Sequence, residues 1–179
     1  MNYKVTKSEN VFNGIVFDVK LDILEYDSGN AGRREVIHHN GGSVILPITN
    51  DGKLVLIKQF RYPLQEILIE APAGKLEIGE DPMVCATREL TEETGYTAKK
   101  ITPLGKISTT PGFCDEILYL YLAQDLTAGD HDREEGEFGM EIFEYTLHEV
   151  DEMIKNGKII DSKTIAVIYH YKSFYLSND

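Results

Sequence analysis

The feature that most constrains this chain is residues 74–96, which begin in a glycine-bearing turn and continue as a helix. Asp81 is a suitable N-cap, Pro82 fits the first helical position, and Gly95 fits a left-handed cap at the helix end. Each residue of a helix advances about 100° around its axis. This places Cys85, Glu89, Glu92 and Glu93 on one face, beside an apolar face of Met83, Ala86 and Leu90.

The three glutamates at positions i, i+3 and i+4 repel one another and would slightly destabilise a bare helix. A cation beside them removes that cost. The cation should be a hard one, because the ligands on offer are carboxylate oxygens, and Mg²⁺ binds through one or two carboxylates, water and substrate phosphates. The alternative is that the glutamates form an ordinary solvated helix face.

The surrounding residues favour the metal interpretation. They follow the pattern G-x5-E-x7-R-E-L-x-E-E-x-G, formed by Gly74, Glu80, Arg88, Glu89, Leu90, Glu92, Glu93 and Gly95. This pattern resembles the Nudix box of the Nudix hydrolase family. It departs from the family at Tyr96, where an aliphatic residue is usual, but a bulky apolar side chain is kept. The resemblance implies an α/β fold, the Nudix-type α/β/α sandwich with a mixed sheet.

Composition narrows the class of protein. A chain of 179 residues suits a single domain spanning 1–179. The net charge of -12 argues against a nucleic-acid partner, which requires a basic surface, but allows a small phosphate-bearing substrate bound through a metal. The two cysteines are too few for a disulfide framework. We find no membrane-spanning run and no signal sequence, and we expect a cytoplasmic protein with no membrane partner.

The N-terminal part, residues 1–45, is expected to form a small antiparallel meander. Residues 15–26 alternate apolar and polar side chains, as in a half-buried strand, and residues 33–39 return after a glycine-containing turn. His38 and His39 are adjacent in this second strand. Neighbouring strand residues point to opposite faces, which argues against a shared metal site.

Residues 46–179 are expected to form the catalytic core. Strands are predicted at 43–49, 53–61, 67–71, 101–108, 117–123 and 140–145, the first two joined as a hairpin through Asn50-Asp51-Gly52. Residues 128–139 are acidic and glycine-rich, which is typical of an exposed, mobile loop. Thr146 and Glu149 form a capping box for one helix, and Asp161 or Ser162 caps the last.

The resemblance also implies roles for residues of the box. Glu89 and Glu93, one helical turn apart, are the leading metal ligands, with Glu92 beside them and the Ala73 backbone carbonyl as an additional ligand. Arg88 would orient a carboxylate, unless it makes only a surface ion pair. In the ADP-ribose pyrophosphatase branch of this family, which further stretches of the chain resemble, the general base is usually a glutamate on the mobile loop after the PG motif. That loop corresponds here to residues 130–138, where Glu134, Glu135 and Glu137 all qualify. Glu135 and Glu137 are our choices for the base.

Stretches outside the box resemble the ADP-ribose pyrophosphatase branch of the family. They are TPGFCDE, whose Pro111 follows Tyr96 by fifteen residues, QFRYP with the later Glu70, and DSKTIAVIY near the C-terminus. The resemblance implies that Arg61, Glu70 and Pro111 belong to the substrate site. It also implies that Arg34 reaches a substrate across a dimer. Glu116 would bind metal or substrate. The alternatives are a strand-edge charge at Arg34 and a solvated turn residue at Glu116.

The function implied by this resemblance is hydrolysis of ADP-ribose to AMP and ribose 5-phosphate, with Mg²⁺ or Mn²⁺, by a homodimer that pairs through residues 1–45. One alternative keeps the chemistry and changes the substrate to another nucleoside diphosphate derivative, such as an ADP-sugar or GDP-mannose. A second alternative is a non-catalytic Nudix module that senses a nucleotide. Such modules commonly lose box glutamates, whereas this chain keeps them.

Overall fold

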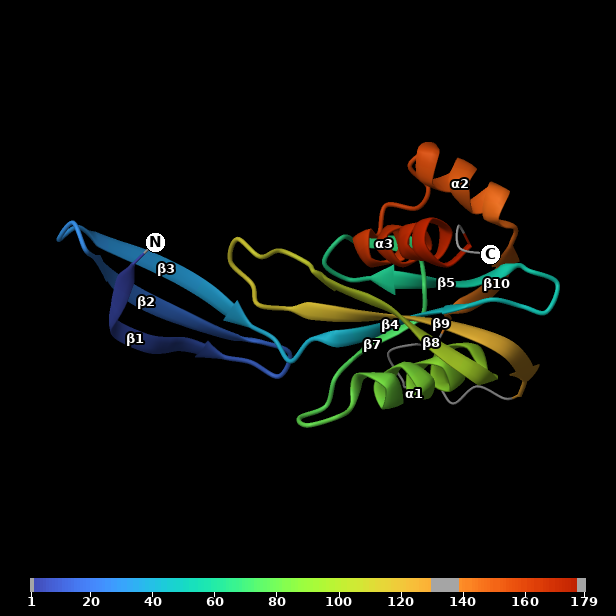
Figure 1. The fold of residues 1–179 in the computed structure, drawn as a ribbon, viewed down its shortest axis with the longest axis horizontal. Helices are drawn as coiled ribbons and strands as arrows, with labels where there is room; N and C mark the ends of the chain where they lie inside the picture. The colour runs from blue at the N-terminus through green and yellow to red at the C-terminus, as the bar shows by residue number, and fades with distance from the viewer. Residues whose placement is uncertain (1, 130–138, 177–179) are drawn as a thin grey trace. The chain divides into compact units, whose positions relative to one another are not determined.

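The computed structural model describes residues 2–129 and 139–176, and it divides the chain into two compact units (Figure 1). The first unit comprises Met1–Gly41 with Ser108–Ile117, and the second comprises Gly42–Ile107 with Leu118–Asp179. Each unit is described by itself. No helix in the described residues is long and apolar enough to cross a membrane.

The first unit is built on a three-stranded antiparallel sheet with the order β1-β2-β3. Its strands are β1 (Tyr3–Asn13), β2 (Asp18–Tyr26) and β3 (Ala31–His38). The predicted antiparallel pairing of the second and third strands is confirmed, although β2 begins at Asp18 rather than Ile15. The sequence analysis missed β1, an exposed strand of mixed polar and apolar residues.

The alternation within β2 does not produce the buried face that we predicted. In β2 the buried residue is Leu24, and it lies on the same side of the strand as the polar Asp18 and Asp22. The apolar residues of the other side are only partly buried. The physical reason is that this unit has no helix among its described residues. A three-stranded sheet that no described helix of its own unit covers leaves both faces partly open to solvent.

The second unit contains two sheets, where we had expected one. A four-stranded mixed sheet has the order β7-β4-β9-β8 and includes β4 (Gly42–Pro47), β7 (Ala73–Lys75), β8 (Tyr96–Ser108) and β9 (Ile117–Ala128). In it β4 runs parallel to β9 and antiparallel to β7. A three-stranded antiparallel sheet has the order β10-β5-β6, formed by β5 (Leu54–Arg61), β6 (Glu66–Glu70) and β10 (Glu141–Tyr145).

The turn at Asn50-Asp51-Gly52 is present, but the long hairpin predicted around it is not. Gly52 has φ of +85° and donates its N–H to the Thr49 carbonyl. Beyond the turn, β4 and β5 belong to different sheets, and within the described residues one isolated antiparallel bridge, Ile48 to Leu54, joins the residue after β4 to the first residue of β5. β4 and the first half of β5 are buried and mostly apolar, so local sequence could not determine which neighbour each would pair with.

In the described part of this unit, three α-helices cover the sheets: α1 (Pro82–Thr94), α2 (Leu147–Lys155) and α3 (Ser162–His170). The last continues into a π-helical segment, Tyr171–Tyr175. The predicted caps are confirmed. Asp81 caps α1, Gly95 follows it with φ of +72°, and Thr146 and Glu149 form both halves of the capping box of α2. Asp161 rather than Ser162 caps α3.

The alternation along β4 shows that helices pack on both faces of the mixed sheet. Val44 and Leu46 belong to a core cluster that also contains residues of α2 and α3, whereas Ile45, between them, packs with Ala86 and Leu90 of α1. Figure 1 shows α1 on one side of this sheet and α3 on the other. The predicted α/β/α sandwich is therefore confirmed. A strand that is buried on both faces has a nearly continuous run of apolar residues in its sequence, as β4 has in SVILP.

The apolar face predicted for α1 is correct for Ala86 and Leu90 but wrong for Met83, which is 39% exposed. Met83 lies in the first turn of the helix, beyond the edge of the core cluster.

We therefore expect Leu90→Ala to lower the free energy of unfolding by about 2–5 kcal/mol, since it leaves a buried cavity. Met83→Ala, the matched control on the same helix, should cost less than about 1 kcal/mol. Denaturant titrations measure both, and equal losses would contradict this packing.

Candidate active site

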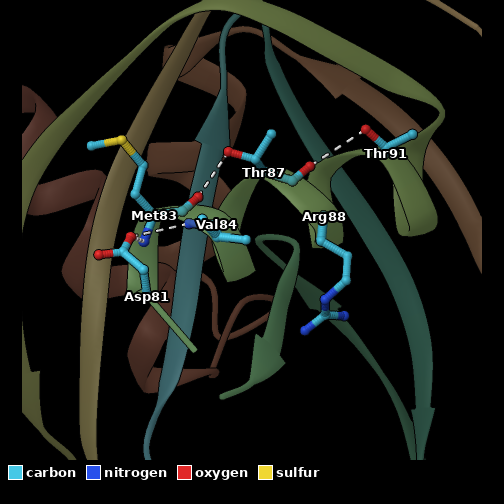
Figure 2. A pocket seen from close by; sticks show the side chains of 6 residues that line it. All are labelled: Asp81, Met83, Val84, Thr87, Arg88 and Thr91. Atoms are coloured by element: carbon cyan, nitrogen blue, oxygen red, sulfur yellow. Dashed lines mark hydrogen bonds between the residues drawn. The ribbon is translucent and has the colours of Figure 1, made fainter. Parts of the chain in front are cut away.

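The turn and cap before α1 determine where its glutamates lie. The Asp81 carboxylate accepts hydrogen bonds from the backbone N–H groups of Met83 and Val84, at 2.9 and 3.3 Å, and so fixes the start of the helix (Figure 2). From this start, α1 turns Cys85, Glu89 and Glu93 inward, and all three are buried. Because the cap sets the rotation of the helix, it also sets the direction of the two carboxylates.

Glu89 and Glu93 are buried against β7 and are only 6% and 2% exposed. The Glu93 carboxylate accepts the backbone N–H of Ala73 at 2.9 Å. The Glu89 carboxylate lies directly over Gly74, where an added Cβ would overlap it. The glycine that opens the box therefore makes space for a carboxylate to approach the backbone closely.

Arg88 donates hydrogen bonds to three carboxylates of the box. Its Nη1 donates to Glu89 at 2.7 Å and to Glu92 at 2.8 Å, and its Nε donates to Glu80 at 3.2 Å. Burial lowers the pKa of Arg88, but hydrogen bonding to Glu80 and the charge of Glu89 outweigh it and raise the pKa. The guanidinium thus stays charged. The orienting role predicted for Arg88 remains a proposal, and these bonds support it.

The carboxylate oxygens of the box are ligands of the kind that a hard divalent cation prefers. Burying carboxylates costs several kcal/mol unless a cation and hydrogen bonds compensate for it, and Glu89 and Glu93 are both buried. In the arrangement described, no group of three or more His, Cys, Asp or Glu side chains among residues 2–129 and 139–176 is gathered to hold a metal ion. Arg88 contacts both Glu89 and Glu92, and so provides positive charge between these two carboxylates.

The other box residue of note is Cys85, on the same helix face as the glutamates. Its sulfur lies 3.5 Å from the Lys75 carbonyl oxygen and 3.6 Å from Arg88 Nη2. Burial, together with the negative charges of Glu80 and Glu89, raises the pKa of Cys85 to about 11. The thiol is therefore neutral at physiological pH, and both cysteines of the chain are free thiols.

A second charged site is formed by Arg61 and Glu70, which are the last residues of the antiparallel strands β5 and β6. Arg61 donates its Nε–H and an Nη2–H to the two oxygens of Glu70, at 2.7 and 2.6 Å, in a bidentate pair. Glu70 is 1% exposed, and Lys163 of α3 contacts the same carboxylate. Burial raises the pKa of Glu70, but bonding to Arg61 and the charge of Lys163 outweigh it and hold the pKa below its usual value.

Three of the predicted substrate residues belong to the first unit. Glu116 pairs with His39 at 3.2 Å, and the neighbouring Asp115 pairs with His38 at 2.6 Å. Each of the adjacent histidines therefore has its own carboxylate. The Arg34 guanidinium donates to the Tyr26 hydroxyl at 2.6 Å. Pro111 is exposed in the turn before Glu116.

The predicted catalytic loop lies mostly outside the described residues. Glu135 and Glu137, our choices for the general base, fall within 130–138, so the structure tests neither of them. Sequence reasoning also missed Lys163, which the fold brings to Glu70 from 93 residues away. The stretch DSKT predicts a helix cap and resembles the ADP-ribose pyrophosphatase branch, but it does not predict a partner for Lys163. Its Asp161 caps α3, and this was the one local signal available.

A pocket lies on the exposed surface of α1 (Figure 2). It is lined by Asp81, Met83, Val84, Thr87, Arg88 and Thr91. The hydroxyl groups of Thr87 and Thr91 donate back to the helix carbonyls of Met83 and Thr87. These polar groups are thus engaged with the helix itself, and we place no chemistry here.

Comparison with known proteins decides the family. The NUDIX domain model matches residues 38–167. The chain belongs to the Nudix family. It is 41% identical, over 93% of its length and 91% of the relative's, to an ADP-ribose pyrophosphatase of Bacillus subtilis (strain 168). Identity and coverage are the same for a methanol dehydrogenase activator of Bacillus methanolicus. A crystal structure of an ADP compounds hydrolase matches with a TM-score of 0.89 and 20% identity, covering 99% of this chain and 96% of that one.

The lowered pKa of Glu70 predicts a pH-dependent contribution to stability. Its folded-state pKa lies below the unfolded value of about 4.5, so the carboxylate stabilises the fold above that value and loses this effect as the pH falls through the folded-state pKa. Glu70→Gln should therefore lower the free energy of unfolding by about 3 kcal/mol near neutral pH, and by clearly less near pH 3.

The matched control is Glu66→Gln, at an exposed position of the same strand. It should change stability by less than about 0.5 kcal/mol at either pH. Denaturant titrations of the three proteins across the pH range provide the measurement. A Glu70→Gln deficit that stays constant or grows on acidification would contradict the pairing described here.

Proposed function

We propose that this Nudix enzyme hydrolyses the diphosphate linkage of ADP-ribose, giving AMP and ribose 5-phosphate. The observation that carries the proposal is the pair of buried carboxylates on α1, Glu89 and Glu93, held against β7 beside a charged arginine. The B. subtilis relative, which shares 41% identity, is an ADP-ribose pyrophosphatase, and this supports the choice of substrate.

Glu89, Glu92 and Glu93, with the backbone of Ala73, are the proposed ligands of the metal, for which Mg²⁺ or Mn²⁺ suits the oxygen donors. A bound divalent cation would neutralise charge on the phosphoryl oxygens and lower the pKa of water. The chain supplies the arrangement of the carboxylates. Ala73 holds Glu93 through its N–H, and Arg88 holds Glu89 and Glu92.

Arg61 is the proposed contact to the substrate diphosphate. Its guanidinium is oriented by the fork to Glu70, and its side chain is 37% exposed, so donors beyond the fork can reach an anion. Pro111 is proposed to belong to the substrate site, Arg34 to reach a substrate across a dimer, and Glu116 to bind metal or substrate. Glu135 or Glu137 is the proposed general base, chosen from the sequence.

The test is release of phosphomonoester from a panel of ADP-ribose, an ADP-sugar and GDP-mannose. We expect ADP-ribose to be preferred and a chelator to abolish turnover. Preference for another member of the panel would change the substrate but keep the chemistry. Binding without release would favour a sensing module.

Glu93→Gln tests the role of the box carboxylates, because it removes a charge with little change in volume. We expect the variant to fold and its turnover to fall by about 10³-fold or more at saturating Mg²⁺, since the metal site contributes several kcal/mol to catalysis. Glu152→Gln is the control, because Glu152 lies on α2 and pairs with Lys155 at the surface. Near-normal turnover in the Glu93 variant would exclude this assignment.

We also propose a homodimer that pairs through residues 1–45, in the reducing environment of the cytoplasm. The support is a concentration of exposed apolar side chains near the N-terminus: Tyr3, Val5, Val11, Phe12, Ile15, Val16 and Phe17. Such a concentration of exposed apolar residues is typical of an interaction surface.

Light scattering at micromolar concentration should give twice the chain mass for the wild type. Val11→Asp should shift this toward the monomer, because a buried charge at an interface is costly. Val84→Asp is the control, at a similarly exposed apolar position on α1. A monomeric wild type would rule out the dimer and the cross-subunit role of Arg34.

A further inference from the structure

A charged cluster at the start of α3 contains a cation that the proposed chemistry has not used. Lys163 is 13% exposed, and its ammonium group contacts the Glu70 carboxylate and lies 3.0 Å from Asp161. Glu70 is more deeply buried than any other member of the cluster. The Lys163 ammonium group is thus largely buried between two carboxylates, whereas the ammonium groups of most surface lysines are solvated.

The cluster is held rigidly by the backbone around it. The Thr164 hydroxyl donates to Asp161 at 2.6 Å and accepts the N–H of Ala71 at 2.7 Å. Ala71 directly follows Glu70, so the N-terminus of α3 is fixed to the same residues that position the Glu70 carboxylate. Lys163 therefore approaches Glu70 from a fixed helix end.

Glu70 is shared between two cations. One carboxylate oxygen accepts the Arg61 Nε–H, and the other accepts from both Arg61 Nη2 and Lys163. With Asp161 included, two positive and two negative charges balance. Removing the charge of Lys163 would leave the cluster with a net charge of -1, and Glu70 would then compensate Arg61 alone. The positive potential that Arg61 offers to an anion would fall.

We propose that Lys163 is a positioning residue for substrate binding, which shares Glu70 with Arg61 and keeps the Arg61 guanidinium oriented and available to the substrate diphosphate. A guanidinium has five N–H donors, and the fork to Glu70 uses two of them. This inference rests on the proposed role of Arg61 in binding the substrate. It adds α3, through Lys163, to the elements that form the site.

The kinetic test compares Lys163→Met, Lys163→Arg and Lys172→Met. Lys163→Met should raise KM for ADP-ribose about tenfold and change kcat by less than about twofold, since it weakens a charge-assisted contact made in the ground state. Lys163→Arg keeps the charge and should restore KM to within about threefold of wild type. Lys172→Met is the matched control, because Lys172 pairs with Asp151 and not with Glu70. It should leave both constants unchanged.

A double-mutant cycle tests whether Lys163 acts through Arg61. In an Arg61→Gln background, Lys163→Met should change KM by less than about twofold, because the group it positions is gone. Lys163→Gln replaces Lys163→Met if that variant fails to fold. Effects on KM that simply multiply, or a fall in kcat with KM unchanged, would overturn the proposal.

An NMR measurement separates this inference from the choice of substrate. Exchange of the Arg61 Nε–H with solvent should be slow in the wild type and in Lys163→Arg, and at least about tenfold faster in Lys163→Met, with no substrate present. If the wild type does not cleave ADP-ribose, the proposed function fails while this measurement still tests the positioning. Unchanged exchange in Lys163→Met would overturn the positioning role.

Discussion

The burial of carboxylates around residues 70–74 is the constraint on which the second unit depends. This short segment bonds to four elements. The Glu70 side chain bonds to Arg61 of β5, the Ala71 N–H to Thr164 of α3, the Pro72 carbonyl to Ile45 of β4, and the Ala73 N–H to Glu93 of α1. Gly74 then leaves room for Glu89. A buried carboxylate without such partners would cost several kcal/mol, so the packing of the helices and the compensation of charge cannot be separated.

Residues 70–74 connect two charged sites, the carboxylates of α1 and the cations around Glu70. Glu89 and Glu93, on α1, are the proposed ligands of a cation, whereas Arg61 of β5 and Lys163 of α3 converge on Glu70 and provide positive charge. The charge of Glu93 also raises the pKa of Arg61, after the larger contribution from Glu70, so the two sites interact electrostatically. Hydrolysis of a diphosphate needs both a cation and anion-binding groups, and one segment of backbone holds the residues proposed for each role.

The first unit has a different basis for its stability. Its three strands carry exposed apolar residues, and the turn at 109–116 is attached to β3 through backbone bonds at Ile37 and the His38 and His39 pairs. A sheet of this size is marginal by itself. The histidine pairs add to the strand pairing of this unit, and the proposed partner subunit would cover its exposed apolar residues.

The sequence by itself determined the local features. Asp81, Pro82 and Gly95 fix the ends of α1, Thr146 and Glu149 fix the start of α2, and the box spacing places Glu89 and Glu93 on one buried helix face. These follow from hydrogen bonds and helical periodicity within a few residues, which local sequence encodes directly. The antiparallel pairing of residues 18–26 with 31–38 follows in the same way from a short turn between alternating strands.

Only the tertiary structure decided what depends on contacts between distant residues. β4 pairs with β9 rather than continuing a hairpin with β5, Met83 stays exposed while Leu90 is buried, and Lys163 meets Glu70 across 93 residues. The apolar runs within 43–49 and 53–61 can pair with several partners, because periodicity specifies which residues are buried but not which strand they pack against. The partner of a buried charge is likewise set by where the chain folds back, so the Arg61–Glu70–Lys163 cluster became visible only once β5, β6 and α3 were packed together.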